Sequence, residues 1–255
     1  MLKTDYYSVS DYCNQTKFQV PDQDIHNHLL DINSKEKSGN DPQEDISRVQ
    51  DALFVHAEIR DIDTNTLDEK TLEGLAKRAN AAFIHFTYNC SILANAMLYN
   101  LESGKEVLCA KNVYPPFKGF HIGFIEKNLF KVDIGTWRRP SSLKNAQDMI
   151  LADHERTQKK FYMLNLQFNT FWGEEGHFLN AVVLNDQDGK ARVVYVDAWT
   201  TSQSIWTLEE LEKEYHPFDI YIIKIFEPLP TVTETIQANQ GTPPSLVLPK
   251  GKARL

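Results

Sequence analysis

The sequence predicts an α+β protein, because a helical half precedes a half built from antiparallel strands. Apolar residues recur at three- and four-residue spacing up to about residue 104. Beyond Gly104, short apolar runs alternate with clusters of turn residues. The patterned part of the chain covers residues 51–227, so we predict one domain there. A polar N-terminal extension over 1–50 and an extended or disordered tail over 228–255 flank it.

Two helices are expected in the first half, one over 68–86 and one beginning near Cys90. Gly104 supplies the stop of the second helix, since glycine adopts the left-handed backbone that ends helices. Both segments show the stripe of an amphipathic helix. Its members are Leu72, Leu75, Ala76 and Ala79 in the first segment and Leu93, Ala94, Met97, Leu98 and Leu101 in the second.

Strands dominate the second half. Asn185–Lys190 is rich in Asn, Asp and Gly and is therefore a hairpin turn between two of them. Thr207 and Glu210 form a capping box that opens a short helix ending near Tyr215. The six expected strands are Glu106–Ala110, Gly119–Ile125, Phe161–Phe168, His177–Leu184, Arg192–Trp199 and Tyr221–Phe226.

Composition narrows the function classes. The 255 residues carry a net charge of −8, which argues against nucleic acid or an anionic membrane as the main partner. The three cysteines (Cys13, Cys90 and Cys109) form no C-x-x-C pair, so neither a disulfide framework nor a cysteine-based zinc site is expected. The first residues lack the apolar core of a Sec signal peptide, and no apolar run is long enough to span a bilayer. We expect a globule from a reducing compartment, without stable membrane insertion.

Cys90 is a candidate nucleophile because it lies on a turn directly before an amphipathic helix. The unpaired N–H groups and the positive dipole end of a helix favour a thiolate there. The same N–H groups can bind a developing oxyanion. Cys109 lies inside a predicted strand, and Cys13 lies in the polar N-terminal segment. Taken alone, a cysteine at a helix start is more often a small buried hydrophobe.

His177 and Asp197 are the candidate base and orienting carboxylate. The predicted hairpin puts the start of one strand beside the end of the other, so these residues are neighbours although twenty positions apart. Separately, a histidine at a strand start and an aspartate at a strand end have ordinary structural explanations. The combination of Cys90, His177 and Asp197 in this order favours catalysis.

Three short motifs resemble the papain-fold toxin group, which contains bacterial effector protein-glutamine deamidases and is similar more distantly to papain-like cysteine proteases. They are Asn89-Cys90 before the helix, Gly176-His177 with Asn180-Ala-Val-Val183, and Val-Tyr-Val-Asp197. The resemblance covers about residues 80–215 and implies a papain-like fold, with the cysteine-bearing helix packed on an antiparallel sheet. It also implies Cys90 as nucleophile, His177 as base and Asp197 as orienter.

The chain departs from the pattern of these families at two positions. Phe83–Thr87 holds no amide side chain that could serve as an oxyanion donor, so this role falls to Asn89 or to backbone N–H groups. Trp199 stands where many members of the toxin group carry glutamine, and it is expected to form a wall of the acyl pocket. Trp172 and Gly176 precede His177, and we place them in the cleft, although Trp172 also suits the core.

The function expected from this resemblance is a secreted bacterial virulence effector that converts glutamine to glutamate on a host protein in the reducing host cytosol. Such a thiol hydrolase needs neither metal nor organic cofactor. A cysteine protease and a transglutaminase use the same residues and remain alternatives. The non-enzymatic alternative is an inactive papain-fold binding module.

Overall fold

The computed structural model describes residues 6–8, 48–49, 52–81, 89–113, 120, 124–132, 139–170, 173–186, 188–200 and 203–228. Its strands form three antiparallel groups. A three-stranded sheet has the order β1 (Tyr6–Ser8), β2 (Leu53–Asp61), β3 (Lys105–Ala110). A pair joins β10 (Ile225–Pro228) to β4 (Phe130–Val132). The third is a five-stranded sheet ordered β8 (Ile205–Trp206), β7 (Ala191–Val196), β6 (Gly173–Asn185), β5 (Phe161–Thr170), β9 (Asp219–Ile223).

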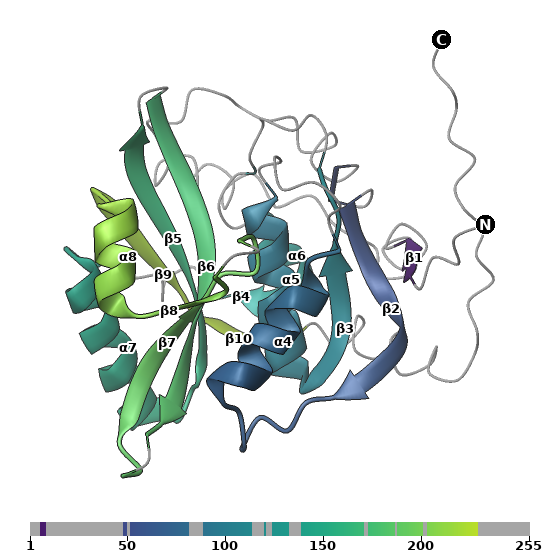
Figure 1. Cartoon of the computed structure of the whole chain (residues 1–255), viewed down its shortest axis with the longest axis horizontal. Helices are drawn as coiled ribbons and strands as arrows, with labels where there is room; N and C mark the ends of the chain where they lie inside the picture. Colours follow the sequence, from purple (N-terminus) through teal and green to yellow (C-terminus); the bar gives the residue numbers. More distant parts are fainter. Residues whose placement is uncertain are drawn as a thin grey trace.

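Helix α5 (Cys90–Ser103) occupies the centre of the fold (Figure 1). It contacts β3 on one side and β6 and β5 on the other, so it lies between the two larger sheets. All residues from Cys90 to Leu101 are buried. The predicted single apolar stripe was therefore too narrow, because this helix is enclosed on every side. Gly104 ends it with φ 64°, as predicted.

The five-stranded sheet separates two apolar cores. Along β6, Phe178 and Val182 belong to the core around α5. Leu179, Ala181 and Val183 point the other way, as strand alternation requires. There they pack beneath α7 (Leu143–Thr157) and α8 (Leu208–Tyr215), which cover the outer face in Figure 1. The sheet thus presents one face to the cysteine-bearing helix and one to a separate helical layer.

Several local predictions are confirmed. The turn after Asn185 joins β6 to β7 as an antiparallel hairpin, with Gly189 at φ 78°. Thr207 and Glu210 form the predicted capping box of α8, which ends at Tyr215. The mixed α+β class with antiparallel sheets is likewise confirmed.

Other elements differ from the prediction. Part of the expected strand Gly119–Ile125 is helical, since α6 spans Phe124–Leu129. Helix α4 (Glu69–Ala79) ends before residue 86, and residues 82–86 lie outside the described part. Strand β7 stops at Val196 rather than at Trp199. The expected strand Tyr221–Phe226 is split at Lys224 into β9 and β10, which join different sheets. Strand β2 and helix α7 had no predicted counterpart.

The predicted extensions fall largely outside the described residues. Within the first 50, Tyr6–Ser8 forms β1 and pairs with β2, and Arg48 and Val49 are buried. The tail after Pro228 is not among the described residues. No helix in the described part of the chain has the length and apolarity needed to cross a membrane.

Candidate functional site

Cys90 is the first residue of α5. The first intrahelical hydrogen bond runs from the Leu93 N–H to the Asn89 carbonyl, so the N–H groups of residues 90–92 precede the ladder. The first turn carries no acidic side chain that would oppose a thiolate. Cys90 retains 6% of its accessible surface. The sulfur therefore belongs to a largely buried residue at the positive end of the central helix.

His177 lies on β6, four residues after the strand begins. On one side it pairs with Leu166 of β5. On the other side β7 has already ended, since its last pair is Asn180 with Val196. The turn that follows β7 fills this position, and its Asp197 places Oδ2 2.7 Å from His177 Nε2. The premature end of β7 is what lets the carboxylate reach the ring.

Asp197 is fully buried and held at several points. Its N–H donates to the Ser204 carbonyl at 2.9 Å, and its Oδ1 accepts from the Trp199 N–H at 2.8 Å. Asn80 donates from Nδ2 to the Ala198 carbonyl at 2.8 Å, which ties the same turn to the end of α4. The carboxylate is thus fixed in one orientation, with Oδ2 directed at the imidazole.

Cys90 lies close enough to the His177 ring to raise its pKa. Because Nε2 faces Asp197, Nδ1 is the nitrogen left for the sulfur. Burial by itself lowers the pKa of His177, but Asp197, through its charge and its hydrogen bond, and then Cys90 raise it to about 10. The imidazolium of His177 is therefore stabilised beside a carboxylate and a cysteine, as in a thiol–histidine pair.

Two aromatic rings fix the plane of the imidazole. Tyr215 stacks on His177 with centroids 5.1 Å apart and 9° between the planes. Trp199 meets the same ring at 5.4 Å and 57°. Burial, followed by the negative charge of Asp197, raises the pKa of the Tyr215 phenol. Tyr215 therefore stacks on His177 and is also influenced by Asp197.

Tyr215 is the site residue that the sequence prediction missed. It is the last residue of α8, eighteen positions after Asp197 and on a different element. The capping box gave the end of this helix correctly, but nothing local shows what the terminal side chain touches. Asn180, which belongs to one quoted motif, has a clear part in the geometry: its Nδ2 donates to the Ala94 carbonyl at 3.0 Å and anchors α5 to β6.

The remaining predicted cleft residues differ in what they contact. Asn89 is buried, and its Nδ2 donates to the Lys111 carbonyl at 2.9 Å, which binds the helix start to the chain after β3. Gly176 lies so close to β5 that a Cβ there would be 2.7 Å from Nε2 of Gln167. Trp172 lies outside the described residues.

Cys109 has a different environment. It lies in β3 opposite Phe54 and is fully buried. Burial raises the pKa of its thiol well above the ordinary range, which Lys111 only partly opposes. Cys13 lies outside the described residues. Within the described part of the chain, no group of three or more His, Cys, Asp or Glu is arranged to hold a metal ion.

Comparison with known proteins identifies the family of this chain. The family model described as Salmonella plasmid virulence protein SpvD matches residues 19–227. The chain belongs to the SpvD family. Its homologues include the virulence protein SpvD of Salmonella dublin and the virulence protein vsdE of Salmonella typhimurium. Each is 25% identical over 198 residues, which is 77% of this chain and 91% of the relative.

Two solved structures of the Salmonella effector SpvD share the fold. The G161 variant has a TM-score of 0.64 and 23% identity, covering 80% of this chain and 99% of that one. The R161 variant has a TM-score of 0.56 and 21% identity, covering 78% and 97%. The expectation of a virulence effector is thus confirmed at the level of the SpvD family, whose named homologues are virulence proteins of Salmonella.

Proposed function

We propose that this SpvD-family chain is a cysteine hydrolase with a papain-like arrangement of Cys90, His177 and Asp197. One observation carries the proposal: a single buried imidazole is hydrogen-bonded to a carboxylate at 2.7 Å and lies close enough to the cysteine at a helix N-terminus for that cysteine to raise its pKa. A nucleophile, a base and an orienting group in mutual contact are the requirement for nucleophilic acyl chemistry. A cysteine beside a buried histidine therefore favours an enzyme over an inactive binding module.

The reaction begins when the Cys90 thiolate attacks the carbonyl carbon of an amide and a C–S bond forms. The negative charge on the amide oxygen is stabilised by N–H groups in the first turn of α5. This assigns the oxyanion role to the backbone, because the Asn89 amide already donates to the Lys111 carbonyl. The C–N bond then breaks, and the leaving amine or ammonia takes its proton from the His177 imidazolium.

The second half of the reaction restores the enzyme. His177, now neutral, accepts a proton from water, and the resulting hydroxide attacks the thioester. The C–S bond breaks, leaving the Cys90 thiolate beside an imidazolium and a carboxylic acid, which gives its proton to the solvent and becomes the carboxylate product. Asp197 keeps Nε2 occupied throughout, so Nδ1 always faces the sulfur and the acyl group.

The substrate we propose is a glutamine side chain of a host protein, which the reaction converts to glutamate. The resemblance of the motifs around Cys90, His177 and Asp197 to those of effector deamidases supports this choice of a side-chain carboxamide. Membership of a virulence effector family supports a host protein as target and the host cytosol as the site of action.

Proteolysis and transamidation share the thioester intermediate, so the product distinguishes them. The full chain is incubated with host-cell protein and with glutamine-containing peptides, and Cys90→Ala provides the control. Deamidation adds about one dalton per site and releases ammonia, whereas cleavage or an amine adduct identifies the alternatives. Cys109→Ala serves as a matched cysteine control and should retain activity. Products that form equally with Cys90→Ala would contradict the proposal.

A further inference from the structure

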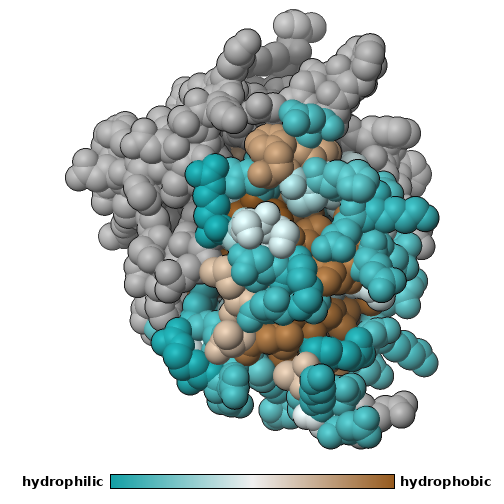
Figure 2. Space-filling model, turned by 90° about the vertical axis from the view of Figure 1, so that its left-hand side faces the viewer, coloured by the Kyte–Doolittle hydropathy of each residue, from teal (hydrophilic) through white to brown (hydrophobic). Residues whose placement is uncertain are grey.

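A pocket with a volume of about 420 Å³ lies on the face of the five-stranded sheet opposite α5. It is bounded by the second half of α7 and by β5, β9 and the residue after β9. Figure 2 views the molecule from the side of these outer helices and shows apolar residues in gaps between hydrophilic ones. The volume falls in the range of small-molecule sites, which combine apolar walls with a few polar groups.

The walls of this pocket combine apolar surface with a few charged groups. Met149, Ile150 and Ile222 supply aliphatic surface from α7 and β9. At one end three charged side chains meet: Asp153, Arg156 and Lys224. An apolar chamber with charges at one end fits a ligand that is itself apolar except for one charged group.

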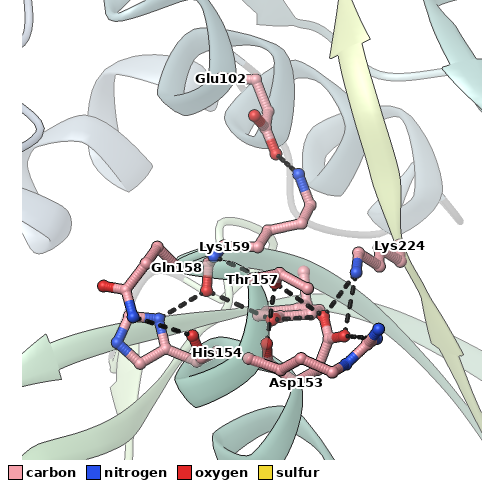
Figure 3. A network of polar contacts seen from close by, with 9 residues as sticks. Glu102, Asp153, His154, Thr157, Gln158, Lys159 and Lys224 are labelled. Carbon is pink, nitrogen blue, oxygen red and sulfur yellow. Dashed lines mark hydrogen bonds and ion pairs between the residues drawn. The ribbon is translucent and has the colours of Figure 1, made fainter.

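The sign of that charge follows from the ion pairs. Lys224 Nζ lies 2.9 and 2.8 Å from the two oxygens of Asp153, and Arg156 reaches the same carboxylate at 2.8 Å. Figure 3 shows Lys224 approaching Asp153 beside the loop that follows α7. Burial opposes ionisation of Asp153, but its hydrogen bonds to Lys224, Tyr162 and Arg156 hold the pKa below its usual range. Two cations against one ionised carboxylate leave a net charge of +1 among these three groups.

Arg156 is the cation that can turn to a ligand. Its side chain is 72% exposed and shares a single contact with Asp153, and exposed pairs of this kind contribute little to stability. Lys224, at 15% exposure, is enough to neutralise Asp153 without it. A guanidinium binds a carboxylate through two parallel hydrogen bonds, so the freed Arg156 is suited to a monoanionic carboxylate.

We propose that this pocket binds a small amphiphilic acid, an unbranched aliphatic chain ending in one carboxylate. The chain packs against Met149, Ile150 and Ile222, and the carboxylate binds Arg156. The site does not involve Cys90, which lies on the other side of the sheet. The proposal therefore stands or falls independently of the proposed hydrolase.

Calorimetric titration of the full chain with hexanoate, octanoate, octanol and octylamine tests this. Octanoate should bind about 16-fold more tightly than hexanoate, because it has two more methylenes and each buried methylene contributes about fourfold. Octanol and octylamine should bind at least about tenfold more weakly than octanoate, since neither pairs with Arg156. Cys90→Ala should bind octanoate like the wild type.

Two variants locate the site. Ala152→Phe fills the pocket from an exposed position of α7, so it should fold normally and abolish octanoate binding. Arg156→Gln should weaken binding about tenfold. Arg192→Gln, a matched exposed arginine paired with Glu69 elsewhere on the surface, should change nothing. The proposal is overturned if octylamine binds as tightly as octanoate, if Ala152→Phe leaves binding intact, if Cys90→Ala abolishes it, or if octanoate does not bind.

Discussion

Cys90 and Cys109 are both buried thiols, with 6% and 0% of their surface exposed, yet their surroundings prepare them for opposite roles. Cys90 opens a helix and lies close enough to His177 to raise its pKa. Cys109 lies in β3 of the three-stranded sheet, where burial raises the pKa of its thiol and keeps it protonated. The exposed fractions alone barely distinguish the two cysteines. What distinguishes them is that Cys90 has a histidine beside it and lies at the N-terminus of a helix, the two surroundings typical of nucleophilic cysteines.

The largest effect expected from this difference is on turnover. Cys90→Ala should reduce activity at least about 10³-fold, because it removes the nucleophile from a group that acts as a unit. Cys109→Ala should leave activity within about threefold. Product formation by mass spectrometry measures both, and circular dichroism checks the fold. If the two variants behave alike, the contrast drawn between the thiols is wrong.

Asp197→Asn should lower activity by about 10² to 10⁴, less than loss of the nucleophile, because Asp197 orients the ring and does not attack. The pH dependence should change in a defined direction. Asp197 is the main group that raises the pKa of His177 against the effect of burial. Without its charge that pKa falls, so the imidazolium is lost at lower pH. The alkaline limb of the activity profile should therefore move to lower pH, and an unmoved limb would show that Asp197 does not govern His177.

The raised pKa of His177 also affects the free energy of unfolding. An unperturbed histidine has a pKa of 6.5, and in the folded chain the pKa of His177 is raised to about 10. Its protonation therefore stabilises the folded chain fully below about pH 6.5, and this contribution is lost as the pH rises through about 10. Denaturant titrations between pH 6 and pH 10 should show that the free energy of unfolding of the wild-type chain falls as the pH rises. The fall should be smaller in Asp197→Asn. An equal decline in both would place its origin in other groups.

Tyr215→Phe should lower activity about three- to tenfold, because it removes the hydroxyl that the charge of Asp197 acts on but keeps the ring stacked on His177. Tyr215→Leu removes the stacked ring as well and should cost more. The alkaline limb should shift in both variants, which a merely structural role would not cause. Tyr221→Phe is the matched control, since its hydroxyl donates at 2.7 Å to Asp219, a carboxylate outside the site. Equal losses in Tyr221→Phe and Tyr215→Phe would remove Tyr215 from the positioning role.

The smallest effect is expected at Gly176. A Cβ there would come within 2.7 Å of Gln167 Nε2, the far end of a flexible side chain. Gly176→Ala should therefore displace Gln167 and reduce activity only about two- to threefold through the adjacent His177. Gly189→Ala, at the hairpin tip, has open space around it but a φ of 78°, so it should lower stability without altering turnover. A loss above tenfold in Gly176→Ala would show that the β5–β6 spacing controls the site more tightly than the contact suggests.

Signals confined to a few residues were readable from the sequence. The stop at Gly104, the capping box at Thr207 and the hairpin turn after Asn185 each depend on local backbone chemistry. The hairpin also brought His177 and Asp197 together, because register follows from the turn. Cys90 lies near this pair, at the start of α5. The catalytic role of these three residues is our proposal.

The remaining features depend on contacts across the fold. Helix α7 escaped prediction because it buries only Leu143, Ala146 and Ile150 in fifteen residues, too few for a clear period. The apolar run around residue 120 suited a strand or a buried helix equally, and packing against α5 selected the helix α6. The stacking of Tyr215 on His177 joins two elements that no local motif connects.

The proposed activation of Cys90 by His177 is tested most directly by the rate at which iodoacetamide alkylates each cysteine of the folded chain at pH 7. Peptide mass spectrometry maps the alkylated cysteines. We expect Cys90 to react at least about 100-fold faster than Cys109, because His177, whose pKa is raised, lies beside it. We also expect His177→Ala to remove most of this advantage while the fold is kept. Equal rates at the two thiols, or a Cys90 rate unchanged by His177→Ala, would contradict the proposed activation.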